Sequence, residues 1–279
     1  MIKRKIIYTF PMLLWLFVMP FALANAEDPA RPVTGSYRLE IGGMNARSTY
    51  LSPLKYSGTS VGASGEWRKS FQKNPENLVM TFSGAVNFED MINTPGSARM
   101  LGADAEFNWG MAYRTRLPKD FQITAGGVVD INGGALYLTR NGNNPVSVNA
   151  WAGIDLTASA SWHFTLGKLP ILVSENVKLP TLGAFFCPGY GETYYEIYLG
   201  NHKGLAHCGW WGNHFSISNF LCLTLDFGRT AMELGYRYDY RSSSANNLVT
   251  RTSRNSFVIG VIPGGIGLKK KNNINSALY

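Results

Sequence analysis

The chain has 279 residues and a formal net charge of +8, and only 16% of its residues are charged. No basic run is interleaved with aromatic residues, so nothing indicates nucleic-acid binding. The three cysteines are too few for a disulfide framework and match no zinc-binding spacing. We expect no cofactor and no metal, and the length suits one large β domain.

The first 26 residues have the pattern of a secretory signal peptide. Lys3-Arg4-Lys5 precedes an apolar run from Ile6 to Leu23, and Ala24-Asn25-Ala26 follows as a small-x-small cleavage site. Two prolines interrupt the apolar run, which disfavours the alternative of a retained anchor helix. We therefore expect cleavage after Ala26 and a single domain over residues 27–279.

A period of two dominates the rest of the chain. From Leu101 to Arg114 and from Val148 to Phe164, apolar side chains alternate with mostly polar or small ones. Successive side chains of a strand point to opposite faces, so this alternation predicts strands with one apolar and one polar face. Weaker copies cover residues 37–41, 61–71, 78–88, 121–137, 215–227, 230–240 and 257–261.

The expected strands are long enough to cross a bilayer. Many exceed the five or six residues that are usual in soluble sheets, and a tilted membrane strand needs about 9 to 11. The connections are expected to alternate between short turns (72–77, 116–120, 165–170, 228–229) and longer polar loops (48–58, 90–99, 138–145, 242–251). This rhythm is typical of an outer-membrane barrel and favours it over a soluble periplasmic β domain.

The strand count depends on residues 171–211. If the chain crosses outward at 171–179 and inward at 215–227, the segment between them is either one outer loop or a loop with two further strands. We expect two further strands, near 185–199 and 205–211. The prediction is an all-β, antiparallel transmembrane β-barrel of about twelve strands, with ten as the alternative.

Three segments resemble an uncharacterised family of outer-membrane barrel proteins found in gut-type anaerobic bacteria. They are Tyr50-Leu51-Ser52-Pro53-Leu54-Lys55-Tyr56-Ser57-Gly58, Tyr194-Tyr195-Glu196-Ile197 with Gly200-Asn201, and Leu223-Thr224-Leu225-Asp226-Phe227. The resemblance implies a barrel in the outer membrane and carries over no site residues. One departure is that Tyr279 follows a polar tail, whereas such barrels often end in an apolar strand with a terminal aromatic residue.

The polar face is expected to gather charges of both signs inside the barrel. These charges suggest either a salt-bridged interior or a constricted polar path for small solutes. The function that follows is a structural barrel or a narrow solute-conducting pore. The expected lumen charges are Asp104, Glu106, Arg114, Asp130, Asp155, Glu233, Arg237, Asp239 and Arg241.

Two alternatives remain to a structural or solute-conducting barrel that catalyses no reaction. His214 and Ser216 lie two residues apart on an expected strand, where a base can reach a nucleophile as in a lipid hydrolase. Here the alternation places both side chains on the lumen face, and no third residue that would complete a catalytic triad is identifiable. The other alternative is a surface-binding protein acting through the outer loops, above all residues 190–198.

The expected partners are outer-membrane lipid and small solutes or surface ligands. Cys187 and Cys208 can form one disulfide if they lie in neighbouring outer segments. The sequence gives no indication of the oligomeric state.

Overall fold

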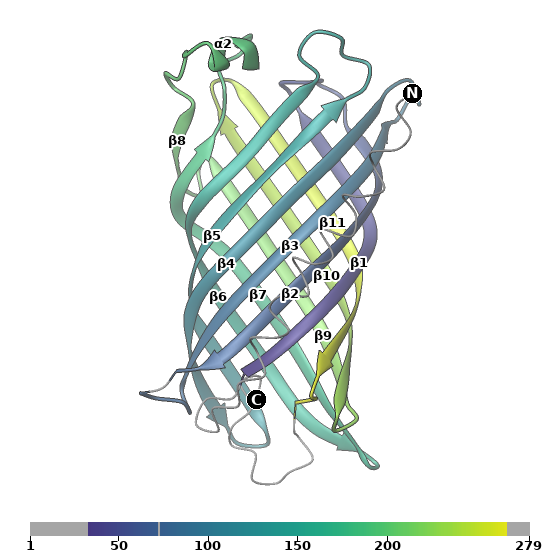
Figure 1. The fold of residues 1–279 in the computed structure, drawn as a ribbon, viewed down its shortest axis with the longest axis vertical. Helices are drawn as coiled ribbons and strands as arrows, with labels where there is room; N and C mark the ends of the chain where they lie inside the picture. Colours follow the sequence, from purple (N-terminus) through teal and green to yellow (C-terminus); the bar gives the residue numbers. More distant parts are fainter. Residues whose placement is uncertain (1–32, 72, 267–279) are drawn as a thin grey trace, which may run out of the picture.

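In a computed structural model, residues 33–71 and 73–266 form a tilted β-barrel (Figure 1). The expected signal peptide and the polar tail before Tyr279 lie outside these described residues. None of the described helices is long and apolar enough to cross a membrane. The elements are β1 (Val33–Ser48), β2 (Tyr56–Ser70), β3 (Leu78–Asn93), β4 (Arg99–Leu117), β5 (Phe121–Leu138), β6 (Val146–Leu166), β7 (Leu169–Phe186), α2 (Tyr194–Tyr198), β8 (Ala206–Gly209), β9 (His214–Asp226), β10 (Thr230–Ala245) and β11 (Leu248–Pro263).

Every neighbouring pair of strands is antiparallel, and the sheet closes on itself. β1 pairs with β11 over a continuous ladder from Tyr37↔Val261 to Ser48↔Thr250. β6 pairs with β7, which joins the two ends of the strand order into a ring. Closure pairs the backbone groups of the wall, which a bilayer could not satisfy with water. The prediction of an antiparallel barrel is confirmed.

β8 and β9 are two parts of one barrel strand. β7 pairs with β8 over Gly183–Phe186 and with β9 over Ile171–Lys178. In the described residues the barrel therefore has ten strands, which is the alternative count that the sequence left open beside the preferred twelve. Instead of a strand, residues 194–198 form the helix α2, because Thr193 and Glu196 make a reciprocal capping box at its start.

The outer wall is apolar, as the alternation requires. Apolar side chains that are at least half exposed include Leu39 and Ile41 on β1, Phe107 on β4 and Leu156 on β6. Their neighbours along each strand are buried or partly buried. A soluble protein rarely leaves so wide an apolar surface in contact with water. This wall therefore fits contact with lipid chains.

One predicted loop is wrong. Residues 242–251 belong mostly to β10 and β11, and only Asn246 and Asn247 connect the two strands. Both asparagines have positive φ, 52° and 61°. A two-residue hairpin turn that matches the right-handed twist of its strands requires positive φ at both positions. The polar residues on either side of this turn therefore belong to β10 and β11 and lengthen these two strands of the barrel wall. The largest outer connection is instead the segment of residues 187–205, which carries α2 at the loop end of the barrel and leads into β8 in the wall (Figure 1).

Candidate functional site

The interior of the barrel is the candidate site, because it collects ionisable side chains away from lipid. Each of the nine expected lumen charges is buried or partly buried in the described structure. Strand periodicity explains this placement, since the inward positions alternate with the exposed apolar positions of the wall.

Ion pairs cross the lumen at mid-height. Lys178 on β7 extends its Nζ to Glu106 Oε1 on β4, 2.5 Å away, and to Asp130 Oδ2 on β5, 2.8 Å away. Arg241 on β10 also binds Glu106. None of these strands is a neighbour of its partner in the sheet, so the bonds span the interior.

The same layer extends to β3 and β11. Arg254 donates to Glu89 Oε1 at 2.5 Å and to Asp104. We call the whole layer the ionic barrier. It consists of Glu89, Asp104, Glu106, Asp130, Lys178, Arg241 and Arg254.

Sequence reasoning missed three members of this layer: Glu89, Lys178 and Arg254. Glu89 follows the exposed Phe88, and Arg254 shares its parity with the buried Ser256 and Val258, opposite to the exposed Phe257, so a stricter reading of parity could have found both. On β7 the polar positions Ser174, Asn176 and Lys178 share one face, but Glu175 on the exposed face obscured this alternation, and the register of β7 shifts against β6 just beyond Lys178, between Pro180 and Leu182. A shift of one residue exchanges the two faces of a strand.

A second ionic group lies nearer the short turns. Arg38 donates to both carboxylate oxygens of Glu233, at 2.7 and 2.9 Å, and to Glu66 at 2.8 Å. The Phe220 ring contacts two guanidinium groups, with Arg38 4.9 Å and Arg237 4.7 Å from its centroid. Such charge-assisted and cation–π contacts compensate the loss of hydration of these buried cations.

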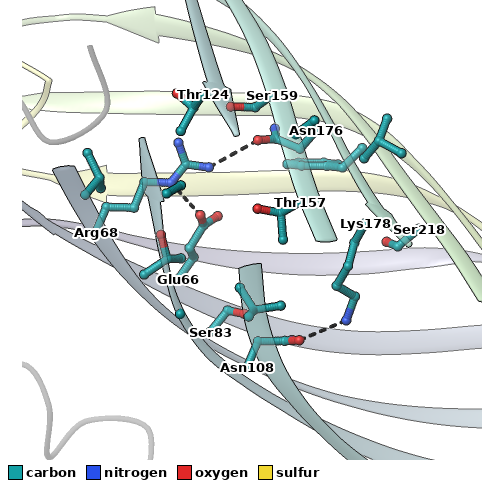
Figure 2. Close-up of a pocket in the computed structure, with 18 of the residues that line it drawn as sticks. Glu66, Arg68, Ser83, Asn108, Thr124, Thr157, Ser159, Asn176, Lys178 and Ser218 are labelled. Atoms are coloured by element: carbon teal, nitrogen blue, oxygen red, sulfur yellow. Dashed lines mark hydrogen bonds and ion pairs between the residues drawn. The ribbon is translucent and has the colours of Figure 1, made fainter. Parts of the chain in front are cut away.

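A chamber of about 170 Å³ lies between the ionic barrier and the short turns. Its wall is rich in hydroxyl groups, and Figure 2 shows several of them around the contacts that Arg68 and Lys178 make. Arg68 donates to Asn176 at 3.2 Å, and Lys178 donates to Asn108 at 2.9 Å. At the turn end, Arg114 holds the carbonyl oxygens of Pro75 and Glu76. The hydroxyl-bearing residues are Ser64, Thr81, Ser83, Thr124, Thr157, Ser159 and Ser218.

A smaller cavity of about 80 Å³ lies on the loop side of the barrier. Above it, inward side chains of β1 to β5 form an apolar cluster that includes Leu51 from the first outer loop. Tyr50 from that loop packs edge to face on Tyr194 of α2, with ring centroids 5.7 Å apart. The Tyr194 oxygen accepts a bond from the Val148 backbone N–H at 2.6 Å, and burial raises the Tyr194 pKa to about 12.

The pair His214 and Ser216 does not have the geometry of an activated nucleophile in the described structure. His214 is buried, and its ring stacks on Trp151 with centroids 4.0 Å apart and planes 2° apart. No hydrogen bond joins it to Ser216 among the described contacts. The stacking thus accounts for the position of this imidazole without a catalytic role.

The cysteines are free, and two of them are badly placed for a disulfide. Cys208 pairs with Ala184 across the ladder, whereas Cys187 lies three residues past Ala184, just beyond the end of β7, and opposite Leu205. Three strand residues span about 10 Å, beyond the reach of a disulfide. In residues 33–71 and 73–266, no three His, Cys, Asp or Glu side chains form a group that could hold a metal ion.

A closed antiparallel barrel with an apolar wall and a charged interior defines an outer-membrane β-barrel protein. The chain belongs to the family described as Protein of unknown function (DUF3316), whose model matches residues 9–272. The expected membership of an uncharacterised barrel family is confirmed. No curated protein matches the chain.

Solved structures of other outer-membrane barrels are similar in fold. The outer membrane protease OmpT from Escherichia coli aligns with a TM-score of 0.48 and 7% identity over 82% of this chain and 96% of that chain. Neisserial surface protein A aligns with a TM-score of 0.35 and 10% identity over 84% and 99%. The transport unit of the autotransporter AIDA-I from Escherichia coli gives 0.44 and 6% over 88% and 97%. These likenesses concern the fold alone.

Proposed function

We propose that the protein is a structural outer-membrane barrel whose lumen is shut to solutes at rest. On this proposal the chain is exported by its signal peptide, cleaved after Ala26, and inserted with its short turns on the periplasmic side. The ionic barrier carries the proposal, because its bonds link opposite walls and leave chambers above and below it. Paired charges that cross the lumen leave no continuous path for hydrated ions.

Single-channel recording in a planar bilayer tests this proposal. We expect the refolded wild-type barrel to be electrically silent. The double variant Lys178→Ala/Arg241→Ala removes both cations that hold Glu106, and it should pass small, cation-selective steps because the remaining carboxylates line the opening.

The matched control is Arg99→Ala, which removes an ion pair with Asp90 that lies exposed on the barrel surface. It should stay silent like the wild type. Heat-modifiable gel mobility verifies that each variant is folded. Discrete steps from the wild-type protein would reject the closed barrel and favour the narrow pore instead.

Surface binding is a second candidate, supported by the loop that connects β7 to β9. Tyr190, Tyr195 and Tyr198 are 81%, 69% and 83% exposed, an unusual density of large rings on one segment. Aromatic residues are enriched where proteins bind partners. Saturable binding of glycans or cell-surface proteins that disappears in a Tyr190→Ala/Tyr195→Ala/Tyr198→Ala variant would support it.

The lipid-hydrolase alternative has weaker support. It needs His214 to act as a base for Ser216, and the stacked, buried imidazole makes no hydrogen bond to that hydroxyl in the described contacts. We expect phospholipid micelles to be hydrolysed no faster with the wild type than with Ser216→Ala. Turnover that Ser216→Ala abolishes would reverse this ranking.

A further inference from the structure

Three cations lie side by side on the outward face of the barrel at its loop end. Arg47 on β1 is the direct ladder partner of Arg251 on β11. Lys55 comes directly before β2, one residue past the ladder pair Ala46↔Tyr56. All three cationic side chains are exposed, and Arg47 and Arg251 continue the outward positions of their strands. We call Arg47, Lys55 and Arg251 the cation row.

The cation row has no counterion within the described chain. Directly opposite residues of an antiparallel ladder have Cβ atoms about 4.5–5.5 Å apart, and like charges there repel each other. In residues 33–71 and 73–266, no carboxylate forms an ion pair with any member of the row. By contrast, the exposed Arg99 on β4 binds Asp90 on β3 at 2.5 Å. An anion bound between the cations of the row would remove their repulsion.

Uncharged polar side chains lie on the same outward face, below the cation row. Ser57 Oγ donates to Asn45 Oδ1 at 2.8 Å, and the Tyr236 hydroxyl donates to Asn255 Oδ1 at 2.9 Å. Amides and hydroxyls both donate and accept hydrogen bonds, so they can also bind the hydroxyl groups of a sugar. We call these outward positions the polar belt, which consists of Asn45, Ser57, Thr59, Ser253 and Asn255.

The apolar wall begins below the polar belt. Ile41, Phe257 and Val61 are ladder neighbours on β1, β11 and β2, and each is more than half exposed. The six residues from Ile41 to Arg47 span about 20 Å along the strand, which a tilt of about 40° reduces to about 15 Å of height. The head-group region of an ordinary phospholipid leaflet is only about 5–8 Å deep. A head group built of sugars would fill the deeper layer between the wall and the row.

We propose that the cation row and the polar belt bind a phosphorylated glycolipid of the outer leaflet. Its phosphate bridges Arg47 and Arg251, because planar guanidinium groups match the geometry of phosphate oxygens. Its sugar hydroxyls pair with the polar belt, and its acyl chains lie against the apolar wall beneath. This inference rests on the proposed orientation, in which the loop end of the barrel faces the outside of the cell.

Native mass spectrometry of the refolded full-length barrel in detergent micelles tests the site, since the mass identifies each bound lipid. The probe is a rough-type lipopolysaccharide of defined mass, which carries phosphates and a short sugar core. We expect one saturable adduct in the wild type. Binding should be about tenfold weaker in Arg47→Gln/Arg251→Gln, because a single charge-assisted hydrogen bond already contributes that much.

The matched control is Arg140→Gln/Lys203→Gln, which removes the same charge from two exposed turn positions outside the barrel ladders. It should bind the probe like the wild type. Heat-modifiable mobility shows that each variant is folded before its spectra are recorded. Absence of a saturable adduct, or equal binding by the two double variants, would overturn the site.

Two further lipids identify the head group. Phosphatidylglycerol has a phosphate but no sugar, and the dephosphorylated probe has the sugars but no phosphate. Both should bind about tenfold more weakly than the intact probe, because each loses one class of polar contact. Equal binding of phosphatidylglycerol would overturn the assignment of a glycolipid, and equal binding of the dephosphorylated probe would overturn the phosphate contact.

Failure of this site and failure of the closed barrel give different results. Conductance steps from a wild-type barrel that keeps its adduct would reject the closed lumen alone. A silent, folded barrel without an adduct would reject the glycolipid site alone.

Discussion

Glu106 is the side chain on which the ionic barrier converges. It accepts bonds from Lys178 and Arg241, which reach it from β7 and β10. A third bond comes from Asn108 Nδ2 at 2.8 Å. Buried charges are tolerated only when paired in this way, because removal from water is costly for each ion alone.

The first prediction concerns this carboxylate. Glu106→Gln should lower the free energy of unfolding by about 3 kcal/mol, the low end for a buried pair that loses one partner, because Lys178 keeps Asp130. Urea unfolding in lipid vesicles, followed by tryptophan fluorescence, measures the change. Arg99→Ala removes an exposed pair and should leave the midpoint in place; an equal loss in both variants would contradict a special role for the barrier.

The second prediction concerns the packing around the Trp151 indole. Gly183→Ala would place a Cβ 2.5 Å from the Ala152 carbonyl oxygen and 2.6 Å from the indole, so we expect a loss of about 1–3 kcal/mol from overpacking. Gly84→Ala is the matched control on β3, because its Cβ would meet nothing closer than 3.7 Å. The same unfolding assay compares the two, and equal stabilities would show that both the indole and the Ala152 backbone can move away at little cost.

At the scale of elements, the connection from β7 to β9 determines how the outer end is covered. Its capped helix α2 places Tyr194 against Tyr50 and the Val148 backbone. Asn246 then ties the β10–β11 turn to the carbonyl oxygens of Cys187 and Pro188, both at 3.2 Å. Two separate hairpins and the long connection thus hold one another in place.

The third prediction is a pH dependence of this docking. The pKa of Tyr194 rises from 10.0 to about 12 on folding. The neutral phenol therefore stabilises the docked connection fully below pH 10, and this stabilisation is lost as the pH rises toward 12. Cleavage of residues 187–213 by a protease active at high pH should accelerate between these values. In Tyr194→Phe, which cannot ionise, that acceleration should be absent; an unchanged profile would exclude Tyr194 as its cause.

At the scale of the molecule, closure holds the strands together in lipid. β11 pairs with β1 on one side and β10 on the other, so it completes the ring. Without it, two strands would expose unpaired backbone groups to the bilayer, where no water can satisfy them.

The fourth prediction follows from this closure. A chain that ends at Asn247, before β11, should lose the compact, heat-modifiable form on gels, because its sheet cannot close. Replacing residues 190–203 with a short Gly-Ser linker should preserve that form, since no barrel ladder includes these residues. A compact truncated chain would mean that β10 and β1 can pair directly.

The sequence alone determined the class of fold and most of the interior charges. Alternation with a period of two is a local property of the chain, because each strand must turn apolar side chains to lipid and polar ones inward. β4 and β6 therefore follow the two clearest alternating stretches, and Asp104, Glu106 and Asp130 lie inside the barrel.

Only the tertiary structure decided the strand count, the ionic partners and the stacking of Trp151 on His214. β8 and β9 share one place beside β7, which depends on pairing between distant segments and not on local pattern. Lys178 meets Glu106 across the barrel because closure brings β7 opposite β4, and no periodicity encodes that distance. Trp151 and His214 meet for the same reason: 63 residues apart in sequence, they become neighbours only when the ring of strands is complete.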